Sequence, residues 1–337
     1  MSAELSDPGL RESFKRLLSE LGSHPVAVVG HARPDGDCIG SQVALARVLR
    51  QLEYEAICVN LHEVPRRLEF AARGEKFVTP AQLDDRDYRV ICVDCADQDR
   101  PGAKIRERFP VVYGNIDHHV SNTAYASHNC VASGASATCE ILGAFFIDEG
   151  LPIDAQTAQA LYTGIITDTG QFRFSSTSHT TFKISAELMA NGANPAEAGY
   201  ELYEREPAGK MQLLQRFLAT FDMHANGRIC LGTIERGVFE ATETSAEDTE
   251  GLVDYARAIE GVEIGGLIEE REDGIKASLR SNDPRIRVDR IAAKFNGGGH
   301  ACAAGLTMPG IPSAVFRREL VAALEERLAE VDAQDRT

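Results

Sequence analysis

Acidic and imidazole side chains recur in this sequence where apolar runs stop, and this feature most constrains the fold. The run VAVVG leads into HARPDGD, RVICV leads into Asp94, and VVYGNI leads into the triplet DHH. A fourth acidic residue, Asp168, ends the helix-like run TGIITD. Because ligands of parallel sheets bind at the carboxyl ends of the strands, we expect these side chains to lie close together.

The first half of the chain alternates strand-like and helix-like segments. PVAVVGHA, EAICVNL, RVICVDCA and VVYGNIDHH are short, largely apolar runs typical of buried strands. IGSQVALARVLRQL, SATCEILGAFFIDEG and DAQTAQALYTGIITDTG show helical patterns, and Asp154 is a candidate N-cap of the last. This alternation predicts an α/β fold, with a parallel sheet in the N-terminal domain and helices on both of its faces.

A smaller α/β domain is expected in the second half. RICLGTIERG, EIGGLIEERED and GIKASLRS are strand candidates, with helices expected near residues 249–260, 288–295 and 313–331. An amphipathic helix over 207–223 and the stop signal NGANP indicate the joint. We therefore divide the chain into a first domain at 1–195, a connecting helix at 196–222 and a second domain at 223–337.

The residues at the segment ends form a candidate set of metal ligands. Carboxylate and imidazole groups without thiolates suit divalent ions such as Mn²⁺. Six ligands are too many for one catalytic ion but suit two ions about 3.5–4 Å apart that share a carboxylate, an arrangement used to cleave phosphate esters. The set consists of His31, Asp35, Asp37, Asp94, a member of the triplet Asp117-His118-His119, and Asp168. Cys92 and Cys95 flank Asp94, but no second pair is spaced for a zinc site, so we expect them to be core residues.

The order HxxxDxD, a lone Asp, DHH and a later Asp resembles the pattern of the DHH phosphoesterases. GGGHACAAG (Gly297–Gly305), preceded by SLRS (Ser278–Ser281), resembles the DHH-associated domain that accompanies them. Together these motifs are similar to those of oligoribonucleases ("nanoRNases") that also act as pAp phosphatases, with cyclic-dinucleotide phosphodiesterases close by. The resemblance extends over residues 20–325.

The resemblance implies a role for each residue of the first domain. His31 and Asp35 would hold one ion, Asp37 and His118 the other, and Asp94 would bridge them, while Asp168 would be a further ligand. His119 would reach the substrate phosphate, and Asp117 would orient an imidazole. Adjacent side chains of an extended segment point to opposite sides, so we expect His118 and His119 to do different work.

The second domain is expected to hold the substrate, with the active site in the cleft between the domains. Glycine lets backbone N–H groups approach an anion closely, and an arginine offers a bidentate fork to phosphate. The candidate substrate-binding residues here are Arg280, Ser281, Gly298, Gly299 and His300, together with His119 of the first domain.

Charge and composition limit the partners. The formal net charge is −16, which disfavours long duplex nucleic acid and is compatible with very short substrates. A basic cluster was expected from Arg280, Arg285, Arg287, Arg290 and Lys294. Eight scattered cysteines suit a reducing cytoplasm, and no run approaches the ~18 apolar residues of a membrane span. We expect a cytoplasmic protein without a membrane partner; a homodimer is one alternative for its oligomeric state.

The expected function is that of a manganese-dependent two-metal phosphoesterase, with Mg²⁺ or Co²⁺ as alternative ions. Its substrates would be short oligoribonucleotides, including dinucleotides, and pAp, with cyclic dinucleotides or pApA as further candidates. Two alternatives are enzymes with the same metal-binding head: a pyrophosphatase or polyphosphatase, and a single-strand exonuclease. A third is a non-catalytic nucleotide-binding protein, which the intact ligand set disfavours.

Overall fold

The structure is a computed structural model that describes residues 4–334, and it divides into one unit up to Arg205 and a second from Glu206. The predicted connecting helix at 196–222 is wrong. Helix α7 (Pro195–Gly199) and the π-helical turn η3 (Tyr200–Glu204) belong to the first unit, and helix α8 (Ala208–Ala219) belongs to the second. The reason is packing: Leu213 and Phe217 of α8 are buried in a core cluster of the second unit.

A six-stranded parallel sheet forms the centre of the first unit, in the order β3-β2-β1-β4-β5-β6. Its strands are β1 (Val26–Val29), β2 (Ala56–Val59), β3 (Phe77–Val78), β4 (Arg89–Val93), β5 (Gly114–Asp117) and β6 (His128–Val131). The strands β1, β4 and β5 are buried along almost their whole length, as the apolar runs predicted. The fold class expected from the sequence is confirmed.

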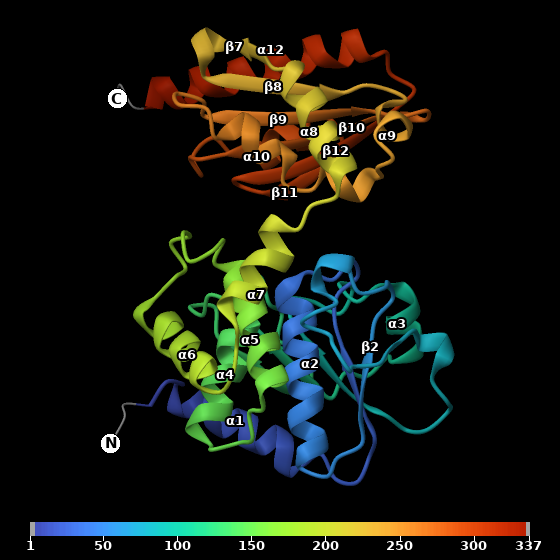
Figure 1. Cartoon of the computed structure of the whole chain (residues 1–337), viewed down its shortest axis with the longest axis vertical. Coiled ribbons are helices and arrows are strands. Elements are labelled where there is room, and N and C mark those ends of the chain that lie inside the picture. Colours follow the sequence, from blue (N-terminus) through green and yellow to red (C-terminus); the bar gives the residue numbers. More distant parts are fainter. Residues whose placement is uncertain (1–3, 335–337) are drawn as a thin grey trace. The chain divides into compact units, whose positions relative to one another are not determined.

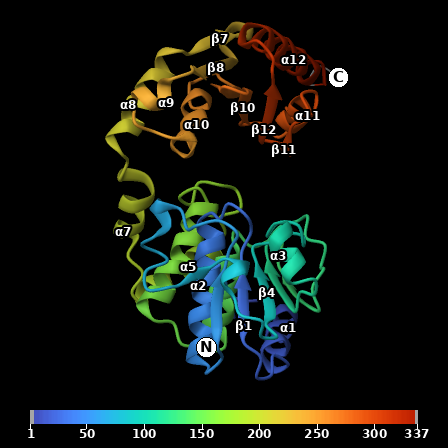
Figure 2. The same ribbon diagram turned by 90° about the vertical axis from the view of Figure 1, so that its right-hand side faces the viewer.

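Helices cover both faces of this sheet. Figure 2 shows α2 and α5 on one side of β1 and β4, and α3 on the other. The helices of the unit, apart from α7, are α1 (Pro8–Ser19), α2 (Gly36–Gln51), α3 (Ala103–Arg108), α4 (Thr138–Asp148), α5 (Ala155–Asp168) and α6 (His179–Ala190), with short turns η1 (Arg66–Leu68) and η2 (Pro80–Gln82). Asp154 is the N-cap of α5, as expected, and its side chain accepts a hydrogen bond from the Thr157 amide.

The second unit is built on a mixed sheet in the order β11-β12-β10-β9-β8-β7, in which only β8 and β9 are parallel neighbours. Its strands are β7 (Asp222–His224), β8 (Ile229–Ile234), β9 (Ile264–Glu270), β10 (Gly274–Ser281), β11 (Gly298–His300) and β12 (Ala303–Pro309). The glycine-rich motif GGGHACAAG, which carries predicted substrate-binding residues, is therefore a hairpin of β11 and β12.

The helices of the second unit also lie on both faces of its sheet (Figure 1). Besides α8 they are α9 (Val238–Ala241), α10 (Leu252–Arg257), α11 (Val288–Ala293) and α12 (Ser313–Gln334), with turns η4 (Ala225–Gly227) and η5 (Ala246–Thr249). Phe316, Leu320 and Leu324 of α12 are buried in the larger of its cores. The strands and helices expected from residue 228 onward are all present, within a few residues of their predicted bounds.

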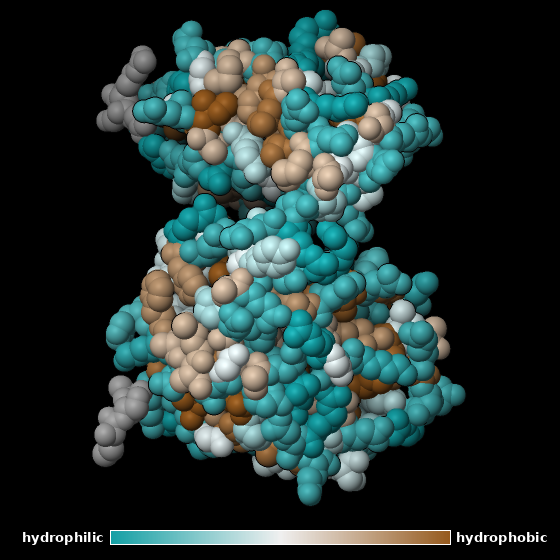
Figure 3. Space-filling view, viewed as in Figure 1, coloured by the Kyte–Doolittle hydropathy of each residue, from teal (hydrophilic) through white to brown (hydrophobic). Residues whose placement is uncertain are grey.

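Hydrophilic side chains dominate the visible face of each unit, with apolar patches between them (Figure 3). Between residues 4 and 334, none of the helices is both long enough and apolar enough to cross a bilayer.

Candidate metal centre

The candidate ligands of the first unit follow the carboxyl ends of its central strands. His31 lies just beyond β1, Asp94 directly follows β4, and Asp117 is the last residue of β5. Strands β1 and β4 are neighbours in the middle of the sheet, where the strand order reverses direction. A ligand of an open α/β sheet binds at this point, so the topology and the acidic residues indicate the same edge.

Asp94 lies at the centre of the constellation and is only 2% exposed. Its Oδ2 lies 3.4 Å from Nε2 of His31, whereas its Oδ1 lies 3.6 Å from Nε2 of His118 and 3.5 Å from Nδ1 of His119. The backbone of Asp94 has a φ of 56°, an uncommon conformation outside glycine. The two carboxylate oxygens thus face different imidazoles, as a carboxylate bridging two ions would.

The surroundings of His31 fit a cation. Its Nδ1 lies 2.9 Å from the carbonyl oxygen of Ala32, and its Nε2 is buried without a hydrogen-bond partner. The same Nε2 faces Asp94 and, at 3.6 Å, Oδ1 of Asp35. An imidazole that donates through one ring nitrogen and turns the other toward carboxylates has the arrangement of a metal ligand.

Asp37 is held by the first turn of α4 from across the unit. Its Oδ2 accepts from the Thr138 amide at 2.7 Å, and its Oδ1 accepts from the Cys139 amide at 2.8 Å. These amides begin α4 and have no partner within that helix. A side chain at Gly164 would meet Oδ1 of Asp37 at 2.8 Å, so this glycine leaves room for the carboxylate. Asp35 itself caps α2, accepting from the Cys38 amide at 3.0 Å.

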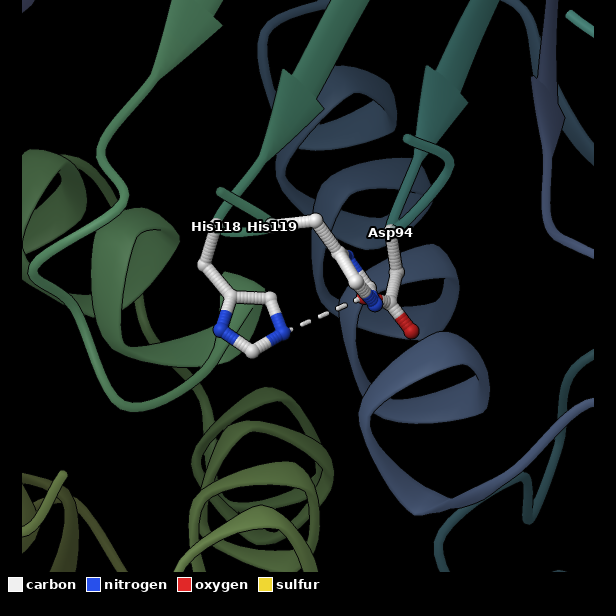
Figure 4. A group of neighbouring side chains, drawn as sticks. All are labelled: Asp94, His118 and His119. Carbon is white, nitrogen blue, oxygen red and sulfur yellow. Dashed lines mark ion pairs between the residues drawn. The ribbon is translucent and has the colours of Figure 1, made fainter. Parts of the chain in front are cut away.

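The two histidines of the DHH triplet do not point to opposite sides, and this expectation is wrong. Strand β5 ends at Asp117, so both histidines lie beyond the extended segment. Their ring centroids are 4.6 Å apart, and both imidazoles turn toward the Asp94 carboxylate (Figure 4). Their other contacts differ: Nε2 of His118 lies 3.2 Å from Asp168 Oδ2, whereas Nδ1 of His119 lies 2.8 Å from Asp117 Oδ1.

Asp117 is fully buried and belongs to a hydrogen-bonded network that the sequence did not indicate. Its Oδ2 accepts from Nδ2 of Asn122 at 2.6 Å, and the same Nδ2 lies 2.8 Å from Oδ1 of Asn115. Thr138 is a second unpredicted neighbour of the site, since its hydroxyl donates to Asp94 Oδ1 at 3.3 Å. Neither residue type carries a motif signal, because asparagine and threonine are common in any loop or helix start.

The electrostatics of the site favour added positive charge. Burial, followed by the charge of Asp37, raises the pKa of Asp94 to about 8. Burial also raises the pKa of Asp168, to about 6, against the opposing hydrogen bond from His118. Burial alone would lower the pKa of His118, but Asp168, Asp37 and Asp94 raise it to about 10. Carboxylates that repel one another have raised pKa values, and a bound divalent cation would favour their charged forms. The pKa values of this site are therefore those expected of a cation site.

Three groups of described residues could each hold an ion, and Asp94 belongs to two of them. The groups are Asp94 with His118 and His119, His31 with Asp35 and Asp94, and Asp37 with His118 and Asp168. The structure thus brings together all six predicted ligands, and it adds His119 to the residues within reach of an ion. Cys92 and Cys95 are buried and belong to none of these groups, as expected of core residues.

In the second unit, strand register brings Arg280 and His300 to one face of the sheet. Arg280 of β10 pairs with Ala303 of β12, which in turn pairs with His300 of β11. Residues directly opposite each other in antiparallel strands share a face, and neighbouring strands lie about 4.8 Å apart. Only the small Ala303 therefore separates the arginine from the histidine.

Ser281, which is also predicted to bind substrate, does not share that face. It is 5% exposed, and its hydroxyl bonds to the backbone of Asp283 in the turn after β10. The two glycines also differ. Gly299 has a φ of 148°, and a side chain there would meet the carbonyl oxygen of Ala303 at 2.4 Å, whereas Gly298 has nothing within 4 Å.

The predicted basic cluster is largely neutralised. Arg285 pairs with Asp283, Arg287 with Asp289, and Lys294 with Glu326, each at 2.6 Å. The guanidinium of Arg280, in contrast, has only a hydrogen bond at 3.1 Å to the carbonyl oxygen of Leu279 among the described residues. Arg280 thus remains a cation available to a ligand.

Comparison with known proteins agrees with the geometry. The model of the DHH family N-terminal domain matches residues 25–165, and that of the DHHA1 domain matches residues 234–330. The bifunctional oligoribonuclease and PAP phosphatase NrnA of Thermus thermophilus is 31% identical to this chain, over 90% of each protein. NrnA of Bacillus subtilis is 28% identical, over 82% of this chain and 87% of the relative.

The fold is shared with a solved structure as well. An exopolyphosphatase-related protein from Bacteroides fragilis superposes with a TM-score of 0.86 at 22% identity, covering 95% of this chain and 96% of the other. The chain therefore belongs to the DHH family of phosphoesterases, and its second unit carries a DHHA1 domain.

Proposed function

We propose that this protein hydrolyses short oligoribonucleotides to mononucleotides and pAp to AMP, using two divalent ions. The observation that carries the proposal is the position of Asp94, whose two oxygens face His31 on one side and the DHH histidines on the other. The names of the two NrnA relatives support the substrate class. Mn²⁺ is the ion we favour, because carboxylate and imidazole ligands suit it, with Mg²⁺ and Co²⁺ as alternatives.

His31, Asp35 and Asp94 would hold one ion, and Asp37, His118 and Asp168 would hold the other, with Asp94 next to His118. When bound, such ions polarise the phosphoryl oxygens and lower the pKa of a water for in-line attack on phosphorus. Asp94 serves both positions, so the arrangement of the whole site depends on it. Asp37 is fixed by two amides of α4, which orients its carboxylate before any ligand arrives.

His119 is the candidate for stabilising the phosphate as its charge grows. Nδ1 of His119 donates to the Asp117 carboxylate, so Nε2 can donate toward substrate when the ring is protonated. The pKa of His119 is raised overall. Its hydrogen bond to Asp117 is the largest effect, and burial and the charge of His118 oppose it. A raised pKa keeps His119 a better donor at neutral pH.

The second unit would bind the nucleotide through Arg280, His300 and the Gly298 amide. Arg280 is an uncommitted guanidinium, and His300 is exposed two strands away on the same face. With a net charge of −16, the protein is poorly suited to long polyanions, which is why we propose dinucleotides, pAp and RNA of a few nucleotides. Cyclic dinucleotides and pApA carry the same phosphodiester and are further candidates, and we propose a cytoplasmic site of action.

A comparison of four substrates tests this proposal against its rivals. The purified protein would be assayed with Mn²⁺ on pAp, a diribonucleotide, pyrophosphate and a long single-stranded RNA. Turnover concentrated on the first two is expected. Preference for pyrophosphate would indicate a pyrophosphatase, preference for the long RNA an exonuclease, and no turnover of any substrate a binding protein.

A further inference from the structure

Two arginines at the metal edge of the first unit, Arg33 and Arg100, have no carboxylate partner among the described residues, unlike several other arginines of the unit. Arg47, Arg73 and Arg86 form ion pairs at 2.6–2.9 Å. Arg33 and Arg100 are exposed, and neither side chain has a hydrogen bond or ion pair with any residue from 4 to 334. The exposed Arg16 of α1 also lacks a carboxylate partner within that range, so what distinguishes Arg33 and Arg100 is their position at the edge of the sheet that carries the metal ligands.

Backbone contacts bring these two arginines together with His62. The Ala32 amide donates to the carbonyl oxygen of Arg100 at 2.8 Å, which joins the loops that follow β1 and β4. The Arg33 amide donates to Nδ1 of His62 at 3.1 Å, which joins the loops that follow β1 and β2. Arg33, His62 and Arg100, which we call the edge cluster, therefore lie on three adjoining loops at the carboxyl end of the sheet.

The edge cluster presents only hydrogen-bond donors. Because Nδ1 of His62 accepts from the Arg33 amide, its proton must sit on Nε2, which is then a donor. Arg33 has a φ of 56°, which costs free energy for a residue with a side chain. A glycine would adopt this backbone conformation without the cost. The presence of an arginine instead indicates that its guanidinium has a function here.

The edge cluster adjoins the metal ligands. Arg33 lies two residues from both His31 and Asp35, so its Cα is within about 7.6 Å of theirs. Arg100 adjoins them as well, because its carbonyl oxygen accepts from the amide of Ala32, the residue that follows His31. Asn60, two residues before His62, is 2% exposed, and neither atom of its side-chain amide has a hydrogen-bond partner in the described part of the chain.

We propose that Arg33, His62 and Arg100 bind the phosphate of the substrate that is not hydrolysed. This would be the second phosphate of a nucleoside bisphosphate or the next phosphodiester of a short RNA, and the inference rests on the proposed function. The ligand class follows from the chemistry, because two guanidinium groups and an imidazole N–H donate to a phosphate and offer it no acceptor. Their place beside the metal ligands puts this phosphate one nucleotide step from the hydrolysed one.

Paired substrates test this subsite. The full-length variants are Arg33→Asn, which keeps a residue tolerant of positive φ, and Arg100→Ala, whose backbone carbonyl still accepts from Ala32. The matched control is Arg16→Ala, which removes an exposed arginine of α1. Arg16 lies at the opposite edge of the sheet, because the carbonyl oxygen of its neighbour Leu17 accepts from the hydroxyl of Tyr113, just before β5. The substrates are pAp and bis(4-nitrophenyl) phosphate, which has one phosphate only.

Each variant is expected to lower kcat/KM for pAp about 10-fold or more and to leave that for bis(4-nitrophenyl) phosphate within about twofold. The Arg16→Ala variant should change neither. Equal loss on both substrates, or no loss on pAp, would overturn the subsite.

Binding provides a second readout that does not depend on turnover. In EDTA, calorimetry should show that the wild type binds pAp more tightly than 3'-AMP, which lacks the phosphate that hydrolysis leaves in place, and that the Arg33→Asn/Arg100→Ala variant does not. Equal affinity for pAp and 3'-AMP in the wild type would overturn the subsite. A wild type that discriminates between them but hydrolyses neither pAp nor a diribonucleotide would overturn the proposed function and leave the subsite supported.

Discussion

Oδ2 of Asp94 lies 3.4 Å from Nε2 of His31, and this nitrogen is buried without a hydrogen bond. A lone pair that faces a carboxylate in the interior is unfavourable unless a proton or a metal ion lies between them. Either a proton or a divalent ion can satisfy the contact. This pair of residues is therefore the most direct sign that the unit is built around cations.

Replacing Asp94 should abolish activity and leave the fold intact. Asp94→Asn removes the carboxylate shared by two of the possible ion positions, so turnover should fall more than about 100-fold. Loss of a residue that only hydrogen-bonds a metal ligand costs about 10–100-fold. Thermal unfolding in EDTA should remain cooperative. The control is Asp85→Asn, whose side chain is fully exposed before β4. An Asp94→Asn protein with two bound ions and more than about a tenth of the wild-type rate would contradict the bridging role.

The two histidines should separate in metal content. His118 faces Asp37, Asp94 and Asp168, so His118→Ala should reduce the bound metal per chain. His119→Ala should retain metal and lose turnover, and Asp117→Asn should cost about 10–100-fold by releasing the same ring. Metal analysis of the purified variants decides the matter. Equal metal loss in both histidine variants would mean that His119 is itself a ligand.

Metal affinity should rise with pH. Asp168 and Asp94, with pKa values of about 6 and 8, hold protons at the low end of this range and must release them to bind an ion. The Kd for Mn²⁺ should therefore fall between pH 6 and pH 8, and binding should release protons into the buffer. Calorimetry in two buffers of different ionisation enthalpy measures both quantities. Affinity independent of pH, without proton release, would refute the competition.

The glycines of β11 should give different results on substitution. Gly299→Val should destabilise the protein by about 1–3 kcal/mol, because its φ of 148° and the carbonyl oxygen of Ala303 exclude a side chain. Gly298→Val should change stability by less than about 0.5 kcal/mol. If the Gly298 amide approaches a phosphate, this variant should still raise KM for pAp, as should Arg280→Ala. Unchanged KM in both variants would remove the β11–β12 hairpin from substrate binding.

Much of the fold could be predicted because the local pattern and the tertiary structure agree. The β-branched runs that became β1 and β4 are buried on both faces, as is β5, and the carboxyl ends of these strands carry the ligands. Strand β6, with the sequence HNCV, was missed because only Cys130 and Val131 are apolar. The β11–β12 hairpin was missed because a run of glycines is more often a turn than a strand.

The finer features of the site depend on contacts between distant residues. Asp94 and Thr138 are 44 residues apart, and Asp37 and Cys139 are 102 apart, so no local pattern could pair them. The prediction of a free basic cluster was wrong for a reason that is visible in the local sequence. Arg285 and Arg287 each lie two residues from an aspartate, in the string DPRIRVD, and pair with it.

The preference for short substrates is the central claim, and a length series tests it most directly. The measurement is kcat/KM for RNA of two to about twenty nucleotides at fixed salt and Mn²⁺. Each added phosphate brings repulsion from a chain of net charge −16, felt over a Debye length of ~8 Å at physiological salt. We predict a maximum between two and about five nucleotides and a decline beyond it. Efficiency that rises steadily with length would contradict the account and indicate a processive exonuclease.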